Sequence, residues 1–302
     1  MKNQYDGAIS NRYDFVCLYD VENGNPNGDP ISNNTPRVDP VTGHGIVTDV
    51  CIKRKIRDYV RMLYGSRRGF EIYVRHGANM SLMDQKGLEA ARDAKSKGEK
   101  SLAFRRAMCG EYFDIRAFGA MITTALKDQS LLREAGQIRG PVQMSFGRTV
   151  DPVTPQDVWI TRLGVTSVKP PEGKGSGLGR KSIVPYGLYR QEGYISANLA
   201  KTATGFSEDD LEAFWDALMH MFDEDRSSAR GKMAIRALVI FKHDSPYGND
   251  FSHNLFERVV IEKKDAAAVS RSFADYTVTL DESDMPDGVT VEKRVWKGKM
   301  IN

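Results

Sequence analysis

The sequence predicts an α+β fold whose elements follow the order β-α-β-β-α-β, the ferredoxin-like arrangement. Three observations predict it. Residues 12–21 alternate apolar and polar side chains with a period of two, which indicates a strand. Residues 48–64 and 207–222 repeat apolar side chains at helical spacing, behind residues that cap helices. Residues 233–241 are apolar on both sides and are expected to form a central strand.

The first half of the chain contains one clear strand and one clear helix. One face of the strand over 12–21 consists of Tyr13, Phe15, Cys17, Tyr19 and Val21. A loop rich in Asn, Gly and Pro follows over 22–45, and loops of that length are commonly functional or disordered. Thr48 is expected to cap a helix that ends near residue 64. Its buried stripe consists of Ile52, Ile56, Tyr59 and Leu63. A short strand is predicted over 70–75.

The second half completes the pattern. Residues 113–135 are predicted to form a helix that ends near Gly136. The next strand has an apolar and a polar face, consisting of Val142, Met144 and Phe146 and of Gln143 and Ser145. The helix over 207–222 opens with a capping box of Ser207 and Asp210. Its buried face consists of Leu211, Phe214, Trp215, Leu218 and Phe222.

Two segments interrupt this order and are expected to project from it. Residues 80–109 are helical and charged, are interrupted by Gly87 and Gly98, and offer little core. Residues 161–194 hold Pro170-Pro171 and a glycine-rich stretch between strand-like flanks, which predicts a long hairpin with a flexible tip. The predicted division is 1–76, 113–160 and 195–250 for the sheet domain, 77–112 for a helical insertion, 161–194 for the hairpin and 251–302 for a C-terminal extension packed on the sheet domain.

Composition excludes several classes of protein. A chain of 302 residues with 40% hydrophobic side chains can bury a sizeable core, so it is not wholly disordered. Because the sequence has no run of 18 apolar residues, no membrane partner is expected. Three widely spaced cysteines and the lack of an apolar N-terminal run argue against zinc fingers and disulfide scaffolds and favour a cytoplasmic protein.

Charge is unevenly distributed behind a net charge of only +3. Lys53, Arg57 and Arg61 recur every four residues beside Arg54, which predicts a basic helical face. The hairpin segment is also basic, whereas residues 208–225 hold eight acids and no Lys or Arg. Phosphates would turn repulsion within the basic face into attraction, although a solvated basic face remains the alternative. Basic and acidic surfaces on one chain also suit head-to-tail self-association.

Enzyme signatures are weak. The glycines of 173–179 lack the order of a phosphate-binding loop, and the loop over 23–29 has too few carboxylates for calcium. Asp29 and Asp39 could hold a metal or act as a base, but aspartates in such loops more often form turns. We therefore expect no cofactor and no resident metal.

Several longer motifs stand out. They are NPNGDP (25–30), PRVDP (36–40), TGHG (42–45) and VTDVCIKRKIR (47–57), with FDIRAFG (113–119), GPVQMSFGR (140–148) and KSIVPYGLY (181–189) in support. Together they resemble the crRNA-binding backbone subunit of type I CRISPR Cascade complexes, a member of the RAMP superfamily, and most closely its type I-C form. The resemblance covers most of residues 12–245.

The resemblance implies a modified RNA-recognition (ferredoxin-like) palm with a helical finger insertion and a β-hairpin thumb. Copies would polymerise along one crRNA as a helical filament and present the guide to the target DNA strand, together with crRNA-processing and large Cascade subunits. Cleavage would be done by a recruited helicase-nuclease, so the chain itself would not be an enzyme. The residues expected at the RNA are Arg37, Thr48, Lys53, Arg54, Arg57, Gln143, Ser145, Arg148, Lys169, Lys174, Arg180 and Lys181.

One departure from RNA-recognition domains affects the mode of binding. The sequence lacks the aromatic signature that such domains use for base stacking, so recognition of the phosphate backbone, independent of base sequence, is expected. Two alternatives stay open. One is a metal-dependent target-RNA endonuclease that uses Asp29 or Asp39, as in related type III backbone subunits. The other is an assembly protein whose charges serve subunit contacts alone.

Overall fold

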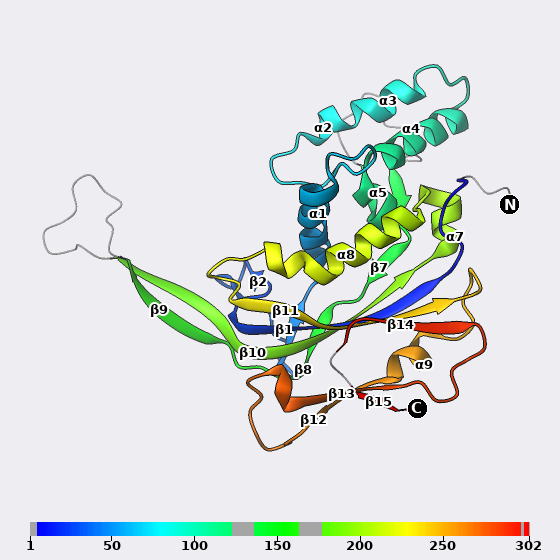
Figure 1. The fold of residues 1–302 in the computed structure, drawn as a ribbon. Coiled ribbons are helices and arrows are strands. Elements are labelled where there is room, and N and C mark those ends of the chain that lie inside the picture. Colours follow the sequence, from blue (N-terminus) through cyan, green and yellow to red (C-terminus); the bar gives the residue numbers. More distant parts are fainter. Residues whose placement is uncertain (1–4, 123–135, 163–176, 297–298, 302) are drawn as a thin grey trace, which may run out of the picture.

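The main sheet of the protein is antiparallel and has the strand order β14-β11-β1-β10-β8-β4, with β7 and β9 also paired to β10 (Figure 1). The computed structural model describes residues 5–122, 136–162, 177–296 and 299–301. The strands are β1 (Tyr13–Gly24), β4 (His44–Val47), β7 (Val142–Met144), β8 (Gly147–Pro152), β9 (Gln156–Arg162), β10 (Gly177–Ile195), β11 (Lys232–His243) and β14 (Val289–Trp296). The predictions of a strand over 12–21 and of a central strand over 233–241 are confirmed.

Helix α1 (Asp49–Tyr64) begins where its cap predicts. The Cys51 N–H donates to the Thr48 hydroxyl, 3.3 Å away, which satisfies one of the free donors of the first turn. The expected stripe is buried except at Leu63, which is 52% exposed. Val60 is fully buried in its place, because the inward face of the helix drifts with the 3.6-residue period.

Helix α8 (Glu208–Glu224) lies beside α1 on the same face of the sheet (Figure 1). The Ser207–Asp210 capping box is formed as predicted, and the five predicted apolar residues are buried. The rings of Phe214 and Trp215 lie 5.8 and 5.2 Å from the ring of Phe15 on β1. These edge-to-face contacts bind the helix to the centre of the sheet.

The predicted β-α-β-β-α-β order is present, but one strand was assigned wrongly. The order is formed by β1, α1, β7 with β8, β10, α8 and β11. Residues 70–75 are not a strand, since Glu71 makes only one isolated bridge, to Tyr112. The Asp114 carboxylate accepts the N–H groups of Tyr73 and Val74 at 2.8 and 3.0 Å, so these donors are not available for strand pairing.

The helical insertion has a core of its own. It consists of α2 (Met80–Met83), α3 (Gln85–Ala91) and α4 (Lys97–Glu111). A separate buried cluster joins it to neighbouring segments through Tyr73, Met83, Ala91, Phe104, Met108, Cys109, Tyr112, Ile115, Ile122 and Ile138. Gly87 does not interrupt a helix: a Cβ there would lie 2.7 Å from the Phe104 ring, so glycine permits α3 to pack closely on α4. The expectation of little core here is wrong.

Helix α5 (Phe113–Phe118) ends far before residue 135, the predicted end. Gly119 adopts a φ of 81°, which turns the chain into β5 (Gly119–Met121). This strand pairs with β6 (Gln137–Arg139). Most of the predicted helix, 123–135, lies outside the described residues.

The predicted hairpin forms an arm that projects from the body (Figure 1). We call β9 and residues 177–183 of β10 the hairpin arm; its pairing runs from Arg162–Gly177 to Gln156–Ile183. From Val184 onward β10 pairs with β1, so this half of the predicted hairpin belongs to the main sheet. The predicted flexible tip, with Lys169 and Lys174, lies outside the described residues.

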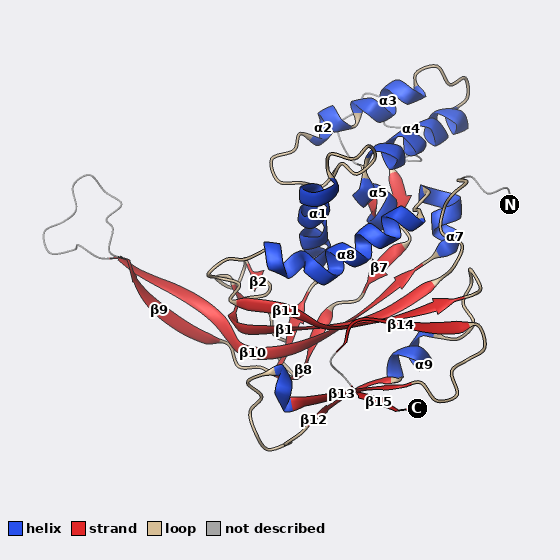
Figure 2. Ribbon diagram, in the orientation of Figure 1, coloured by secondary structure: helices blue, strands red, loops and turns tan. Residues whose placement is uncertain are grey.

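The C-terminal segment covers the second face of the sheet (Figure 2). It forms α9 (Ser252–Glu257), β12 (Val259–Lys263), β13 (Tyr276–Asp281) and β15 (Lys299–Ile301), while β14 joins the main sheet beside β11. Val16 and Leu18 of β1 belong to one buried cluster with Leu255 and Val278. Both faces of the central strands are therefore covered. No helix of the described residues has the length and apolar character needed to cross a membrane.

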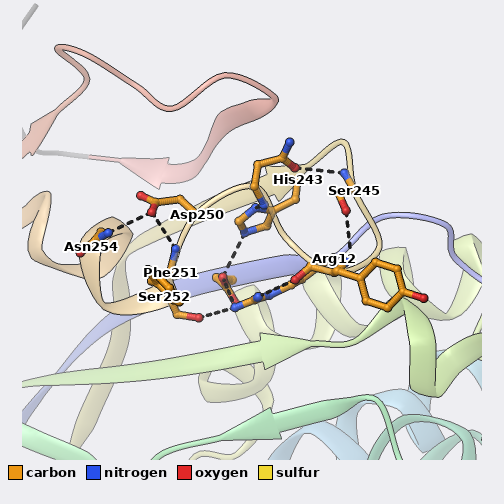
Figure 3. Close-up of polar contacts among 10 residues, drawn as sticks. Arg12, His243, Ser245, Asp250, Phe251, Ser252 and Asn254 are labelled. Atoms are coloured by element: carbon orange, nitrogen blue, oxygen red, sulfur yellow. Dashed lines mark hydrogen bonds and ion pairs between the residues drawn. The ribbon is translucent and has the colours of Figure 1, made fainter.

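A buried polar cluster fastens the loop before α9 to the start of β1 (Figure 3). His243 Nε2 lies 3.0 Å from the Asp14 carboxylate, and both side chains are fully buried. The Asn249 N–H donates to His243 Nδ1, so Nε2 carries the proton that is donated to Asp14. Arg12 donates to the same carboxylate at 2.9 Å and also to the Ser252 hydroxyl. The cluster holds the C-terminal layer in register with the sheet.

Candidate nucleic-acid interface

Five of the residues predicted at the RNA, Arg37, Thr48, Arg54, Ser145 and Arg148, line three surface depressions. The loop depression, of about 480 Å³, is lined by Arg37, Thr48 and Phe146. The strand depression, of about 360 Å³, is lined by Ser145, Phe146 and Arg148. The helix depression, of about 300 Å³, is lined by Asn27 and Arg54. Phe146 lines the first two, and Asn27 of the third hydrogen-bonds to Thr48 of the first, so the depressions adjoin one another.

Strand pairing sets the spacing along this surface. In the register of β4 and β8, Ile46 lies opposite Arg148 and Val47 opposite Gly147. The Ile46 N–H donates to the Arg37 carbonyl, which places the loop residue on the far side of β4. Two strand spacings separate the backbones of Arg37 and Arg148, about 10 Å. We call Arg37, Arg54 and Arg148 the rim arginines.

Arg37 is only partly neutralised. Its guanidinium lies 3.6 Å from the Asp29 carboxylate, and its side chain is 32% exposed. Within the described part of the chain, its buried Nε atom has no hydrogen-bond partner. The exposed part of the Arg37 side chain lines the loop depression, where its guanidinium can bind a phosphate.

Arg148 and Arg54 are the most exposed of the predicted cations for which side chains are described. Arg148 donates to the Asp39 carboxylate at 3.0 Å and is 54% exposed. Arg54 lies 3.6 Å from Asp58 and is 66% exposed. Exposed pairs of this kind contribute about 0–1 kcal/mol, so a phosphate can replace the carboxylate at little cost.

The loop aspartates act as turn formers. Asp29 accepts the Ile31 N–H at 3.1 Å. Asp39 accepts the N–H groups of Val41 and Thr42, and these bonds, with the Arg148 guanidinium, lower its pKa to about 2. No group of three or more acidic, His or Cys side chains among the described residues is arranged to hold a metal ion.

Thr48 is already occupied as a helix cap. Its hydroxyl donates to Asn27 Oδ1 at 3.0 Å and accepts the Cys51 N–H. The Thr48 N–H also donates to Asn27 Oδ1, which pins the loop to the start of α1. One lone pair of the hydroxyl stays available, so any contribution of Thr48 to RNA binding is that of an acceptor or of a residue that shapes the loop.

The four basic residues predicted to form one face of α1 do not share one exposed surface. Lys53 and Arg57 turn inward across the Phe118 ring, at 5.5 and 5.0 Å from its centroid. Arg57 Nε donates to Asp114 at 2.8 Å, with the two side chains only 11% and 1% exposed. Lys53 pairs with Asp49 at 3.0 Å. Only Arg54 and Arg61 of the predicted face are exposed, so the expectation of a continuous external ridge is wrong.

The polar face predicted around residue 143 is also partly engaged. Gln143 Nε2 donates to the Gly140 carbonyl at 3.0 Å. The Ser145 hydroxyl accepts the Glu192 N–H at 3.1 Å. The Gln143 side chain therefore fixes the turn before β7, and the Ser145 side chain supports the contact with β10; of the two, only Ser145 lines a depression.

The described cations of the hairpin arm lie apart from the three depressions. Arg180 is 3.4 Å from Asp157 across the arm. Lys181 donates to the Ser228 hydroxyl at 2.7 Å, which joins the base of the arm to the segment after α8. Neither residue lines the loop, strand or helix depression.

Two residues of the site escaped the sequence analysis. Asp114 was quoted within a motif but was not recognised as the partner of Arg57, which lies far from it in the sequence. Phe146 was assigned to the buried side of a strand but is 52% exposed. The sequence feature that could have indicated this exposure is the neighbouring Gly147. In the structure, a Cβ at Gly147 would lie 2.2 Å from the Tyr19 hydroxyl. Such a glycine marks a place where one strand ends and the next begins.

Comparison with known proteins bears on the family of the chain. The sequence matches the family described as CRISPR-associated protein Cas7 over residues 11–281. A protein of Haloferax volcanii, named CRISPR-associated protein Cas7, is 27% identical over an alignment of 292 positions that covers 90% of this chain and 81% of that protein. Chains from two solved structures, described as a CRISPR RNA-guided surveillance complex, one of them pre-nicking, align over 76% of this chain at 15% identity. They have TM-scores of 0.49 and 0.45 and are covered over 78% and 68% of their lengths. The family match takes in every strand of the main sheet except β14, both covering helices and the hairpin arm, and on this ground the chain belongs to the CRISPR-associated Cas7 family.

Proposed function

We propose that the chain is a non-catalytic, crRNA-binding backbone subunit of a cytoplasmic Cascade complex of type I-C. In this proposal copies polymerise along one guide RNA, contact the other Cascade subunits and hold the spacer open for pairing with target DNA. Family membership and the motifs over 25–57 support it.

The observation that carries the proposal is the row of three adjoining depressions edged by the rim arginines. Each of these arginines is paired with a carboxylate at the surface, where the exchange of a carboxylate for a phosphate costs little. Release of counterions from the RNA adds a favourable term that does not depend on base sequence. A track of this kind suits a protein that coats spacers of any sequence.

Because both faces of the main sheet are covered, the structure supports recognition of the phosphate backbone of the RNA. RNA-recognition modules commonly stack bases on an open sheet face. Here α1 and α8 cover one face and the C-terminal layer covers the other. The accessible route for RNA therefore runs along the sheet edge at β4 and β8, where the rim arginines Arg37 and Arg148 lie.

In the same proposal the main sheet is the palm, the α2–α4 insertion is the finger and the hairpin arm is the thumb. The arm extends well beyond the body (Figure 1), so it can reach a neighbouring copy. Trp159 is 65% exposed on the arm, and a large exposed side chain there suits contact with that copy or its RNA.

The engagement of Asp29 and Asp39 favours the non-catalytic alternative. The Asp39 carboxylate accepts two turn N–H groups and faces Arg148, and Asp29 Oδ1 accepts a turn N–H and faces Arg37, so both side chains already serve the structure of the loop. Incubation of the assembled complex with complementary RNA and Mg²⁺ tests this point. The target RNA should stay intact, and regular cleavage that is lost in Asp39→Ala or Asp29→Ala would overturn it.

Co-expression with a crRNA tests the main proposal. The purified protein should elute as an oligomer with a high ratio of absorbance at 260 to that at 280 nm, and RNA should be released as salt concentration rises. Elution as an RNA-free species at physiological salt would contradict the proposal.

A further inference from the structure

We propose that Phe146 is a stacking platform for one nucleobase of the bound RNA strand, held between the phosphate-binding arginines Arg37 and Arg148. This inference rests on the proposed function and adds to it a contact with a base.

The first step is the direction of the side chain. Phe146 and Arg148 are exposed, whereas Gly147 and Thr149 between and after them are buried. Alternation with a period of two places Phe146 and Arg148 on one side of the backbone. Extension of the β4–β8 register by one step sets Phe146 opposite Thr48, and both line the loop depression.

The second step is the rigidity of the backbone that presents the ring. The Ser145 N–H donates to the Glu192 carbonyl at 2.9 Å, and the Gln191 side-chain amide donates to the Ser145 carbonyl at 2.8 Å. On the other side, Gly147 lies against the Tyr19 hydroxyl. Because both neighbours are fixed, Phe146 cannot fold into the core without breaking β8 from β10. A rigid aromatic ring binds a base with little loss of conformational entropy.

The third step distinguishes Phe146 from the other exposed aromatic residues. Single exposed hydrophobic residues are common, and Tyr247 and Phe251 are 77% and 71% exposed. Trp159 on the hairpin arm is 65% exposed, and Tyr194 is 37% exposed. Of these five aromatic residues, Phe146 alone lines any of the three depressions. Arg37 lines the same loop depression, and its guanidinium is only partly neutralised by Asp29. A cationic groove with an aromatic platform is the usual composition of a site for single-stranded nucleic acid.

The salt dependence of RNA affinity distinguishes a base-stacking contact from an electrostatic contact with a phosphate. Binding of a fluorescent single-stranded RNA is measured for the full chain and for Phe146→Ala over a series of salt concentrations. The variant should bind roughly 5- to 100-fold more weakly with an unchanged slope of log affinity against log salt, because no phosphate contact is lost. Tyr247→Ala is the matched control and should bind as the parent does. Both variants should keep the parent's urea midpoint, because each removes a side chain that is largely exposed.

An abasic RNA of the same length identifies the base as the partner. Loss of affinity in Phe146→Ala should disappear when the bases are removed and the phosphates kept. In Phe146→Trp, binding should persist and the added indole fluorescence should be quenched, against the background of the three natural tryptophans.

The possible results distinguish failure of the proposed function from failure of the stacking role of Phe146. If the parent chain binds no RNA, the proposed function fails and this inference with it. If the parent binds RNA and arginine variants weaken binding but Phe146→Ala does not, only the stacking role is overturned. An equal loss on abasic RNA, or a lower salt slope in Phe146→Ala, would likewise overturn it.

Discussion

The inward face of helix α1 and the three depressions both carry cations paired with aspartates, yet the pairs of the two regions serve different purposes. Arg57 and Asp114 are nearly inaccessible, and Asp114 also accepts two backbone N–H groups. Arg148 and Asp39 lie at the surface, where Arg148 is more than half exposed. A buried pair holds the structure because neither charge can find water, whereas an exposed pair can exchange its anion. Burial, and not the number of charges, thus separates structural cations from candidate RNA ligands.

The largest effect is expected from a break in the buried pair. Asp114→Ala should lower the free energy of unfolding by about 3–5 kcal/mol, because it leaves Arg57 unpaired and two buried N–H groups without acceptors. Urea unfolding followed by circular dichroism measures the change. Asp58→Ala, which removes the exposed partner of Arg54, is the matched control and should change stability by less than about 0.5 kcal/mol. Similar losses in both variants would remove the distinction between the regions.

The reverse pattern is expected for RNA. Replacement of the three rim arginines by alanine should weaken RNA binding strongly and lower the slope of log affinity against log salt by about 2, at roughly 0.7 per phosphate contact. The fold should persist because all three side chains are exposed or half-buried. Replacement of Lys242, Lys264 and Arg271, which are exposed elsewhere, removes the same charge and should leave the slope nearly unchanged. Equal slopes in the two triple variants would show that the rim does not bind phosphate.

Removal of the Asp39 charge beside Arg148 is expected to raise RNA affinity by a smaller amount. Asp39→Asn keeps an oxygen for the Val41 and Thr42 N–H groups but removes the charge that competes for Arg148. RNA affinity should rise by roughly 2- to 5-fold, the size of an exposed pair. A fluorescence anisotropy titration at low salt measures it. Weaker binding by Asp39→Asn would mean that the aspartate itself serves the RNA contact.

The smallest effect concerns acid stability. Because the pKa of Asp39 is lowered to about 2 from 3.8, its contribution to stability is present above about pH 4 and is lost as the pH falls toward 2. The pKa values of Asp275 and Asp281 are lowered too, mainly by backbone and Ser283 hydrogen bonds respectively. Asp39→Asn should therefore reduce, without abolishing, the fall in urea midpoint between pH 4 and 2. An unchanged fall would mean that Asp39 contributes no acid sensitivity.

Most features that depend on residues close together in the chain were predicted correctly from the sequence, whereas most features that depend on distant residues were not. The caps at Thr48 and Ser207 were correct because a cap and its partner lie three residues apart. The strand expected over 70–75 was wrong because Asp114, distant in sequence, takes its N–H groups. Leu63 was wrongly assigned to the buried stripe because the inward face drifts around the helix and includes Val60, three residues earlier, in its place.

By itself, the sequence determined most of the periodic elements, the helix caps, the two insertions and the motifs on which the family resemblance rests. Those properties depend on residues close together in the chain. Tertiary structure decided which cations face the surface, since Arg57 meets Asp114 only after α1 packs beside α5. It also decided that Phe146 points outward, since the contacts of Ser145 and Gly147 with β10 and β1 form only in the assembled sheet. Whether a side chain can contact a ligand depends on the residues that tertiary packing brings next to it. The local periodicity of the sequence does not indicate which residues these are.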